Sequence, residues 1–146
     1  MRRHRRVLFL LLSIVGFALS ASAQQVGPAG KQDSGFRLEQ NYPNPFNPET
    51  KIPFVLYEDL FVDGRPAVVS VRIFNVLQQF ITAPTALNHP NGEGVPVIEL
   101  AYPLPGRYET YWDGRDSQGR QVASGVYFVQ LTVNGRSQVQ RMYVTK

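Results

Sequence analysis

Few residues of this 146-residue chain have the types and spacing that enzyme chemistry requires. There is no Cys and there are two His, which excludes a cysteine nucleophile and a zinc site built from Cys and His ligands. His89 lies in the turn-like run Asn-His-Pro-Asn-Gly, so we predict that it is exposed in a loop. A Ser-His-Asp triad would need this histidine on a rigid element. The sequence therefore predicts no cysteine- or histidine-based reaction centre.

The carboxylates could support calcium binding or acid–base catalysis. Asp113 and Asp116 are three residues apart, but the alternating ligands of a calcium-binding loop are missing around them. Residues 116–119 begin with Asp and end with Gly, which is typical of a type I turn. The acidic pair at 58–59 and Glu93 lie in loop-like sequence, where nothing would separate the pKa values of an acid and a base. We therefore predict no enzyme activity, no cofactor and no metal site.

The N-terminal residues predict export. Four Arg lie within residues 1–6, an uncharged apolar run covers residues 7–20, and Ala-Ser-Ala at 21–23 fits a signal-peptidase site. The apolar run is shorter than the roughly 20 residues that span a bilayer. We predict a signal peptide over residues 1–23, Sec export to the periplasm, and no transmembrane span in the mature chain. Cleavage leaves 11 basic and 11 acidic residues, so the basic stripe of a nucleic-acid-binding protein is not expected.

The rest of the chain predicts a leader and one domain. Residues 24–35 are polar, contain Gly and Pro, and predict a flexible leader. Residues 36–146 contain short stretches of period-two alternation rich in Val, Ile, Tyr and Phe, and no sustained helical spacing. The predicted strands are residues 52–56, 69–73, 80–82, 95–100, 107–112, 126–133 and 136–144. About seven short antiparallel strands predict an all-β fold, an immunoglobulin-like β-sandwich.

The same alternation assigns the side chains of the core. Pro53 lacks an N–H group and predicts that the strand over residues 52–56 lies at a sheet edge. The predicted core residues are Ile52, Phe54, Leu56, Val69, Val71, Ile73, Trp112, Tyr127, Val129, Leu131, Val139 and Tyr143.

Asn-Gly at 134–135 predicts a hairpin between the last two strands. A two-residue loop would pair Val129 with Gln140 and bury glutamines. A three-residue loop pairs Val129 with Val139 and separates the apolar and polar faces better. We therefore predict the three-residue loop, with Val139 and Tyr143 facing the core.

Residues 41–50, here called the proline-rich segment, read Asn-Tyr-Pro-Asn-Pro-Phe-Asn-Pro-Glu-Thr. Three Pro fix φ and remove three backbone donors, so the segment is rigid and cannot be a ladder strand. Tyr42 and Phe46 are the large apolar groups that can hold it against the sandwich. We interpret it either as a stiff lid over an open sheet edge, which the physical argument favours, or as a docking element for another protein.

These motifs, in this order, resemble the type A C-terminal sorting domain of type IX secretion, and are also similar to the immunoglobulin-like domain of the flagellar hook-capping protein. The resemblance rests on residues 36–50, Ile-Phe-Asn at 73–75, Trp-Asp-Gly-Arg-Asp at 112–116, Gly-Val-Tyr-Phe at 125–128 and the ending 141–146. Gln78 stands where the family usually has Gly, so that turn is expected to form without a residue free to adopt positive φ. By position, the resemblance assigns a sorting motif to Pro43, Asn44, Pro45, Gly125, Tyr127, Arg141 and Lys146.

The resemblance implies a secreted, non-enzymatic sorting or anchoring domain that directs an exported protein across the outer membrane to the cell surface or the medium. The implied partners are a protein of the secretion or outer-membrane machinery and a sortase-like protease that removes the domain. Such domains follow a large cargo, whereas only residues 24–35 separate signal and domain here. A stand-alone surface or assembly module therefore remains an alternative.

Two further interpretations stay open. The first is a module that binds a protein or a glycan, which requires an exposed aromatic patch formed by Tyr102, Tyr111 and the insertion over residues 82–102. The second is a cap or assembly subunit like the flagellar relative, which predicts oligomers that depend on concentration.

Overall fold

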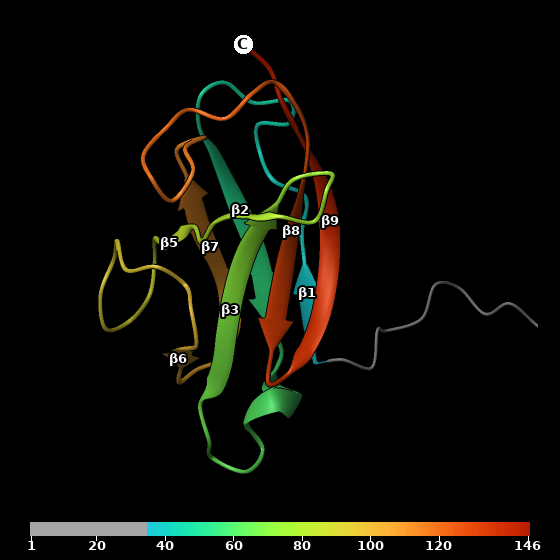
Figure 1. Ribbon diagram of the computed structural model, residues 1–146. Helices are drawn as coiled ribbons and strands as arrows, with labels where there is room; N and C mark the ends of the chain where they lie inside the picture. The colour runs from blue at the N-terminus through green and yellow to red at the C-terminus, as the bar shows by residue number, and fades with distance from the viewer. Residues whose placement is uncertain (1–34) are drawn as a thin grey trace, which may run out of the picture. The chain divides into compact units, whose positions relative to one another are not determined.

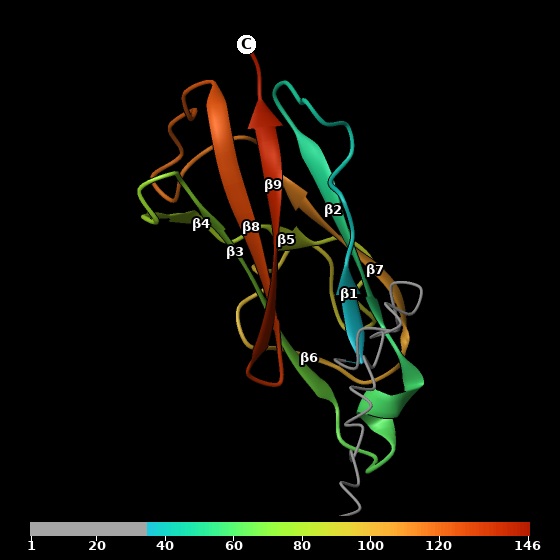
Figure 2. The same ribbon diagram turned by 90° about the vertical axis from the view of Figure 1, so that its right-hand side faces the viewer.

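In this computed structural model, residues 35–146 are described and form two antiparallel β-sheets that face each other (Figure 1, Figure 2). The predicted all-β class and immunoglobulin-like sandwich are therefore confirmed. The predicted signal peptide, residues 1–23, and the predicted leader, residues 24–35, lie outside the described residues except for Gly35. Within residues 35–146, no helix is long and apolar enough to cross a membrane.

Each sheet forms from stretches in which apolar and polar residues alternate, because successive side chains of a strand point to opposite faces. Sheet A has the order β1-β2-β7-β5, with β1 (Phe36–Leu38), β2 (Thr50–Leu56), β7 (Gly106–Trp112) and β5 (Thr85–Ala86). Sheet B has the order β4-β3-β8-β9, with β4 (Phe80–Thr82), β3 (Ala67–Phe74), β8 (Gly125–Val133) and β9 (Arg136–Val144). In sheet B, β3 also pairs with β6 (Leu100–Tyr102), and a short 3-10 helix, η1 (Glu58–Phe61), lies between β2 and β3 in the chain.

The core between the sheets contains the inward-facing side chains of both. Most predicted core residues are buried there, namely Ile52, Phe54, Leu56, Val69, Val71, Ile73, Trp112, Tyr127, Val129 and Leu131. The predicted strand over residues 95–100 is wrong. In its place Val97 connects the two sheets. Its N–H donates to the carbonyl of Pro84, which directly precedes β5 of sheet A, and its carbonyl accepts from the N–H of Val71 in β3 of sheet B.

The predicted register of the last hairpin is also wrong. Asn134 and Gly135 both have positive φ, 49° and 82°, and form a two-residue loop that pairs Val129 with Gln140. Every side chain of β9 therefore lies on the face opposite to the predicted one. Val139 and Tyr143 are 56% and 39% exposed, whereas Met142 and Val144 are buried.

The reason for this register lies in Gln138, which faces inward at the edge of sheet B. Its Nε2 donates to the carbonyl of Phe36 at 2.9 Å, and its Oε1 accepts from the N–H of Leu38 at 2.8 Å. The Gln138 side-chain amide thus bonds to backbone groups of β1 that point away from β2. A polar side chain with both kinds of partner avoids the cost of burial, so the argument against inward-facing glutamines does not apply here.

Pro53 does not mark a sheet edge, because β2 lies between β1 and β7. The Pro53 carbonyl accepts from the N–H of Glu39 at 3.0 Å. In an antiparallel strand the nitrogen and carbonyl of one residue point to the same side, so the missing donor of Pro53 also faces away from β7. The position of the missing N–H lies just beyond the end of β1, where the hydrogen bonds between β1 and β2 have already stopped. The pairing of β2 with β7 is therefore unaffected.

The turn between β3 and β4 places Gln78 in the left-handed region, with φ of 60°. The sequence did not predict this, because a side chain there costs about 1 kcal/mol. The Asn75 side chain holds the turn in this form, since its Oδ1 accepts from the N–H groups of Leu77 and Gln79 at 3.0 and 2.9 Å.

His89 is only 8% exposed, so the prediction of an exposed loop histidine is wrong. Its Nδ1 accepts from the N–H of Asn91 at 3.1 Å, and its Nε2 therefore donates to the carbonyl of Ala101 at 2.7 Å. The ring stands edge-on to Tyr102, with centroids 4.5 Å apart. His89 thus ties the long connection between β5 and β6 to the sandwich.

Tyr102 lies at the centre of an aromatic cluster and is 1% exposed. Its ring centroid is 4.6 Å from that of Tyr108 and 5.5 Å from that of Phe54. The Tyr102 hydroxyl is buried without a hydrogen-bond partner among the described residues, and burial raises its pKa. Tyr102 therefore cannot contribute to the exposed aromatic patch that the binding-module interpretation requires, and Tyr111 is half-buried.

Tyr102→Phe is expected to raise the free energy of unfolding by about 1 kcal/mol, because it removes a buried, unsatisfied hydroxyl and keeps the ring. The matched control is Tyr108→Phe, which removes a hydroxyl that donates to the Leu104 carbonyl at 2.6 Å and should cost about 1 kcal/mol. Urea unfolding of the purified protein measures both. A Tyr102→Phe protein less stable than the parent would contradict the assignment.

Candidate functional site

The proline-rich segment runs between the edges of the two sheets, at the end of the sandwich where the C-terminus lies (Figure 1). Its three prolines remove three backbone donors, and the N–H groups of Tyr42 and Phe46 each bond to one of the two edges. Tyr42 exchanges two backbone hydrogen bonds of 2.9 Å with Lys51 of β2. Phe46 donates its N–H to the Tyr143 carbonyl of β9 at 2.9 Å, and its carbonyl accepts from Thr145 at 3.0 Å. The segment thus covers the last part of the β9 edge, as the lid interpretation requires.

Asparagine side chains supply the hydrogen bonds that proline cannot. Asn41 is 1% exposed, and its Nδ2 donates to the Pro43 carbonyl at 3.1 Å and to Thr50 Oγ1 at 3.0 Å. The Oδ1 of Asn44 accepts from the N–H of Tyr143 at 3.0 Å. One amide therefore fixes the internal shape of the segment, and the other attaches it to β9.

Three aromatic side chains form a row beneath the segment. Phe46 is 1% exposed and stands edge-on to Trp112, with centroids 5.3 Å apart. Trp112 in turn stands edge-on to Tyr127 at 5.6 Å. Trp112 Nε1 donates to the Arg115 carbonyl at 2.8 Å, and the Tyr127 hydroxyl donates to the carbonyl of Ala123 four residues upstream at 2.9 Å. This aromatic row, Phe46–Trp112–Tyr127, joins three motifs that are far apart in the sequence.

Two glycines are needed for this arrangement. Gly114 has φ of 74°, and a Cβ built there would lie 2.3 Å from the carbonyl oxygen of Pro48. Only glycine lets the loop after β7 approach the proline-rich segment so closely. Gly125 has φ of 149° where β8 begins, a backbone conformation that residues with a side chain rarely adopt.

The structure brings most of the predicted sorting motif to one end of the sandwich. Gly125 pairs with Val144, and Val144 also forms a bridge with Phe46. Pro43, Pro45 and Lys146 are exposed at this end, Asn44 is half-buried, and Tyr127 is buried in the aromatic row. Arg141 is exposed farther along β9, paired with Phe128, and does not join the cluster.

The motif assignment missed Asn41, Thr50 and Gly114. A signal for Gly114 is present in the sequence, because Asp-Gly marks turns in which Gly supplies a positive φ. The hydrogen bond between Asn41 and Thr50 joins residues nine apart and had no local signal.

Side chains on the outer face of sheet A form hydrogen bonds with Tyr42 and Glu49 of the proline-rich segment. The Tyr42 hydroxyl donates to Glu109 Oε1 at 2.7 Å, which is the main reason that the pKa of Glu109 lies below its ordinary value. Arg107 Nη1 also donates to Glu109, at 2.9 Å. The Tyr111 hydroxyl donates to Glu49, and this bond raises the pKa of Tyr111 to about 12.

The aspartates of the loop after β7 hold that loop together. Asp113 Oδ1 accepts from the N–H of Arg115 at 3.0 Å. Asp116 accepts from the N–H groups of Arg120 and Gln118 at 2.9 and 3.0 Å, and chiefly the Arg120 bond keeps its pKa below the ordinary value. Within residues 35–146, no three His, Asp or Glu side chains are grouped so as to hold a metal ion.

The fold defines the described residues as an immunoglobulin-like β-sandwich domain. No family model matches the chain, and no curated protein does. Among solved structures, it is similar to PorZ of Porphyromonas gingivalis, an essential bacterial surface component of the type IX secretion system, with a TM-score of 0.42 and 22% identity over 73% of this chain. It is also similar to dimeric latent PorU from Porphyromonas gingivalis, with a TM-score of 0.48 and 16% identity over 75% of this chain. The chain covers 11% and 9% of the lengths of these two proteins.

Proposed function

We propose that residues 36–146 form a non-enzymatic sorting or anchoring domain that directs outer-membrane translocation or cell-surface attachment through type IX secretion. The observation that supports this most is the convergence of the family-like motifs. The proline-rich segment, the Trp-Asp-Gly loop and the start of β8 meet in the aromatic row Phe46–Trp112–Tyr127. The end of β9 joins them through the bridge between Phe46 and Val144.

The surface formed in this way suits recognition by another protein. Tyr42, Pro43 and Pro45 are exposed on a segment whose backbone is fixed by proline and by bonds to both sheets. A rigid surface loses little conformational entropy on binding. The proposed partners are a protein of the secretion machinery and a sortase-like protease, and Sec export directed by residues 1–23 would precede their action.

A secretion assay tests the proposal directly. Residues 24–146 are fused behind a Sec signal and a reporter protein and expressed in a host with type IX machinery. We expect the reporter on the cell surface or in the medium, and a reporter that stays in the periplasm would contradict the proposal.

A pair of exposed substitutions separates recognition from folding in the same assay. Pro45→Ala changes the recognition end and is expected to reduce export. Val62→Ala is the control, because Val62 is 86% exposed beside η1 at the opposite end of the sandwich (Figure 1). Equal export of both folded variants would place recognition elsewhere on the domain.

A further inference from the structure

The outer faces of the two sheets differ in chemistry. On sheet A the charged side chains pair with one another, through contacts of 2.9–4.0 Å that are Arg37–Glu39, Lys51–Glu109, Arg107–Glu39 and Arg107–Glu109. That face is suited to contact with water. The outer face of sheet B has no such network among the residues that the structure describes.

The strand register arranges the outer face of sheet B in two adjacent rows. One row across β3, β8 and β9 is Arg72, Gln130 and Val139. The next row is Phe74, Phe128 and Arg141. Because residues two apart on a strand share a face, the apolar side chains lie together and an arginine lies at each of two diagonal corners.

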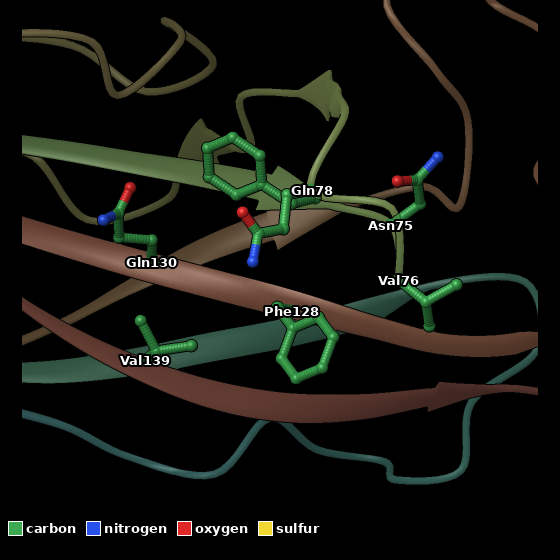
Figure 3. Close-up of a pocket in the computed structure, with 7 residues that line it drawn as sticks. Asn75, Val76, Gln78, Phe128, Gln130 and Val139 are labelled. Atoms are coloured by element: carbon green, nitrogen blue, oxygen red, sulfur yellow. The ribbon is translucent and has the colours of Figure 1, made fainter.

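A groove of about 460 Å³ lies over these rows. Figure 3 shows Phe128, Gln130 and Val139 on the strands, with Gln78 of the β3–β4 turn on the same side of the sheet. The turn adds apolar residues at the rim, since Val76 and Leu77 are 63% and 74% exposed. Phe80, Val139 and Tyr143 are also exposed on this sheet. Exposed apolar residues gathered in this way mark interaction sites.

The charges of this face have one sign. None of the five strands of sheet B contains Asp or Glu. Arg72 of β3 and Arg141 of β9 lie on the outer face, whereas Arg136 belongs to the opposite face of β9 and lies over the Phe36 ring. Arg72 and Arg141 make no ion pair with any residue from 35 to 146. An apolar groove between two unpaired guanidinium groups is complementary to apolar side chains flanked by carboxylates.

We propose that the outer face of sheet B is a docking surface for a segment of another protein that combines apolar and acidic side chains. The apolar side chains fill the groove over Phe74, Phe128 and Val139, and the carboxylates pair with Arg72 and Arg141. This surface is separate from the proline-rich segment, and the proposal does not rest on the secretion function. An anionic membrane is a poorer match, because lipid-binding surfaces collect about 4–8 basic residues.

Peptide binding tests the proposal. The probes are fluorescent ten-residue peptides in which Val or Phe alternates with Glu, a second set with Lys in place of Glu, and a third with Ser in place of the apolar residues. The full-length purified protein is titrated into each, and fluorescence anisotropy reports binding. We expect only the acidic, apolar set to bind, with affinity that falls as salt rises. Absence of binding up to millimolar protein, or equal binding of all three sets, would overturn the proposal.

Substitutions on the outer faces of the two sheets locate the binding. Arg72→Gln with Arg141→Gln, and separately Val139→Thr, are each expected to weaken binding at least tenfold while circular dichroism stays unchanged. Arg37→Gln is the matched control on sheet A and should leave the affinity unchanged. Loss of binding in the control as well would overturn the placement on sheet B.

Two further measurements test other occupants. Light scattering that shows a dimer abolished by Val139→Thr would assign the face to a second copy and overturn the proposal. Binding to phosphatidylglycerol vesicles, abolished by the double arginine variant and stronger than binding to the peptides, would assign it to a membrane.

Discussion

Gly114→Ala is expected to lower the free energy of unfolding by about 3 kcal/mol. Two costs add at this position. A side chain at φ of 74° is strained by about 1 kcal/mol, and a Cβ 2.3 Å from the Pro48 carbonyl oxygen forces the loop and the proline-rich segment apart, at a cost of about 2 kcal/mol. Urea or thermal unfolding of the purified protein measures the change.

Gly119→Ala is the matched control in the same loop. Its φ is 79°, but a Cβ there would meet nothing within 4 Å. Only the backbone cost remains, so the expected loss is about 1 kcal/mol. Equal losses in the two variants would show that the close approach at Gly114 contributes nothing.

Phe46→Ala is expected to cost about 4 kcal/mol, because it removes a large, fully buried ring and leaves a cavity beside Trp112. The proline-rich segment would lose its main attachment, and the fluorescence of the single Trp should report this by a shift towards longer wavelength. The fused reporter should also fail to leave the periplasm, if it is stably produced.

Phe80→Ala provides the comparison for Phe46→Ala. Phe80 is 49% exposed on sheet B, so the same truncation should cost about 1 kcal/mol and leave the Trp fluorescence unchanged. A loss from Phe46→Ala as small as this would mean that the segment is held by its backbone bonds alone.

Local sequence patterns predicted the fold because the long strands are regular. The alternation over residues 69–73 and 107–112 appears in β3 and β7 with the expected faces inward. β1, β5 and β6 were not predicted, because two or three residues are too few to show a period. β4 is equally short and was predicted only as a continuation of the strands before it. The anchoring of the proline-rich segment by Phe46 was foreseen from composition, since the segment has few other apolar groups.

The errors arose where partners distant in sequence decide the outcome. The argument against burying Gln138 considers only the apolar core, whereas the partners of this side chain are backbone groups of β1 about a hundred residues away. Pro53 was judged by a rule for edge strands, although an interior strand tolerates it where the neighbouring ladder stops. The turn-like neighbours of His89 predict an exposed side chain, whereas contacts with Tyr102 and Ala101 bury it. None of these contacts has a local signature.

The positions of the two ends of the described chain have a mechanical consequence. Gly35 accepts a backbone hydrogen bond from Tyr57 beside η1, whereas β9 runs the length of the sandwich to the other end (Figure 2). Nine residues of extended strand measure about 30 Å. A protein joined ahead of Gly35 would therefore begin about one domain length from the proline-rich segment. The sandwich would act as a rigid spacer. Even a large protein joined ahead of Gly35 would then leave the proline-rich segment accessible to a binding partner.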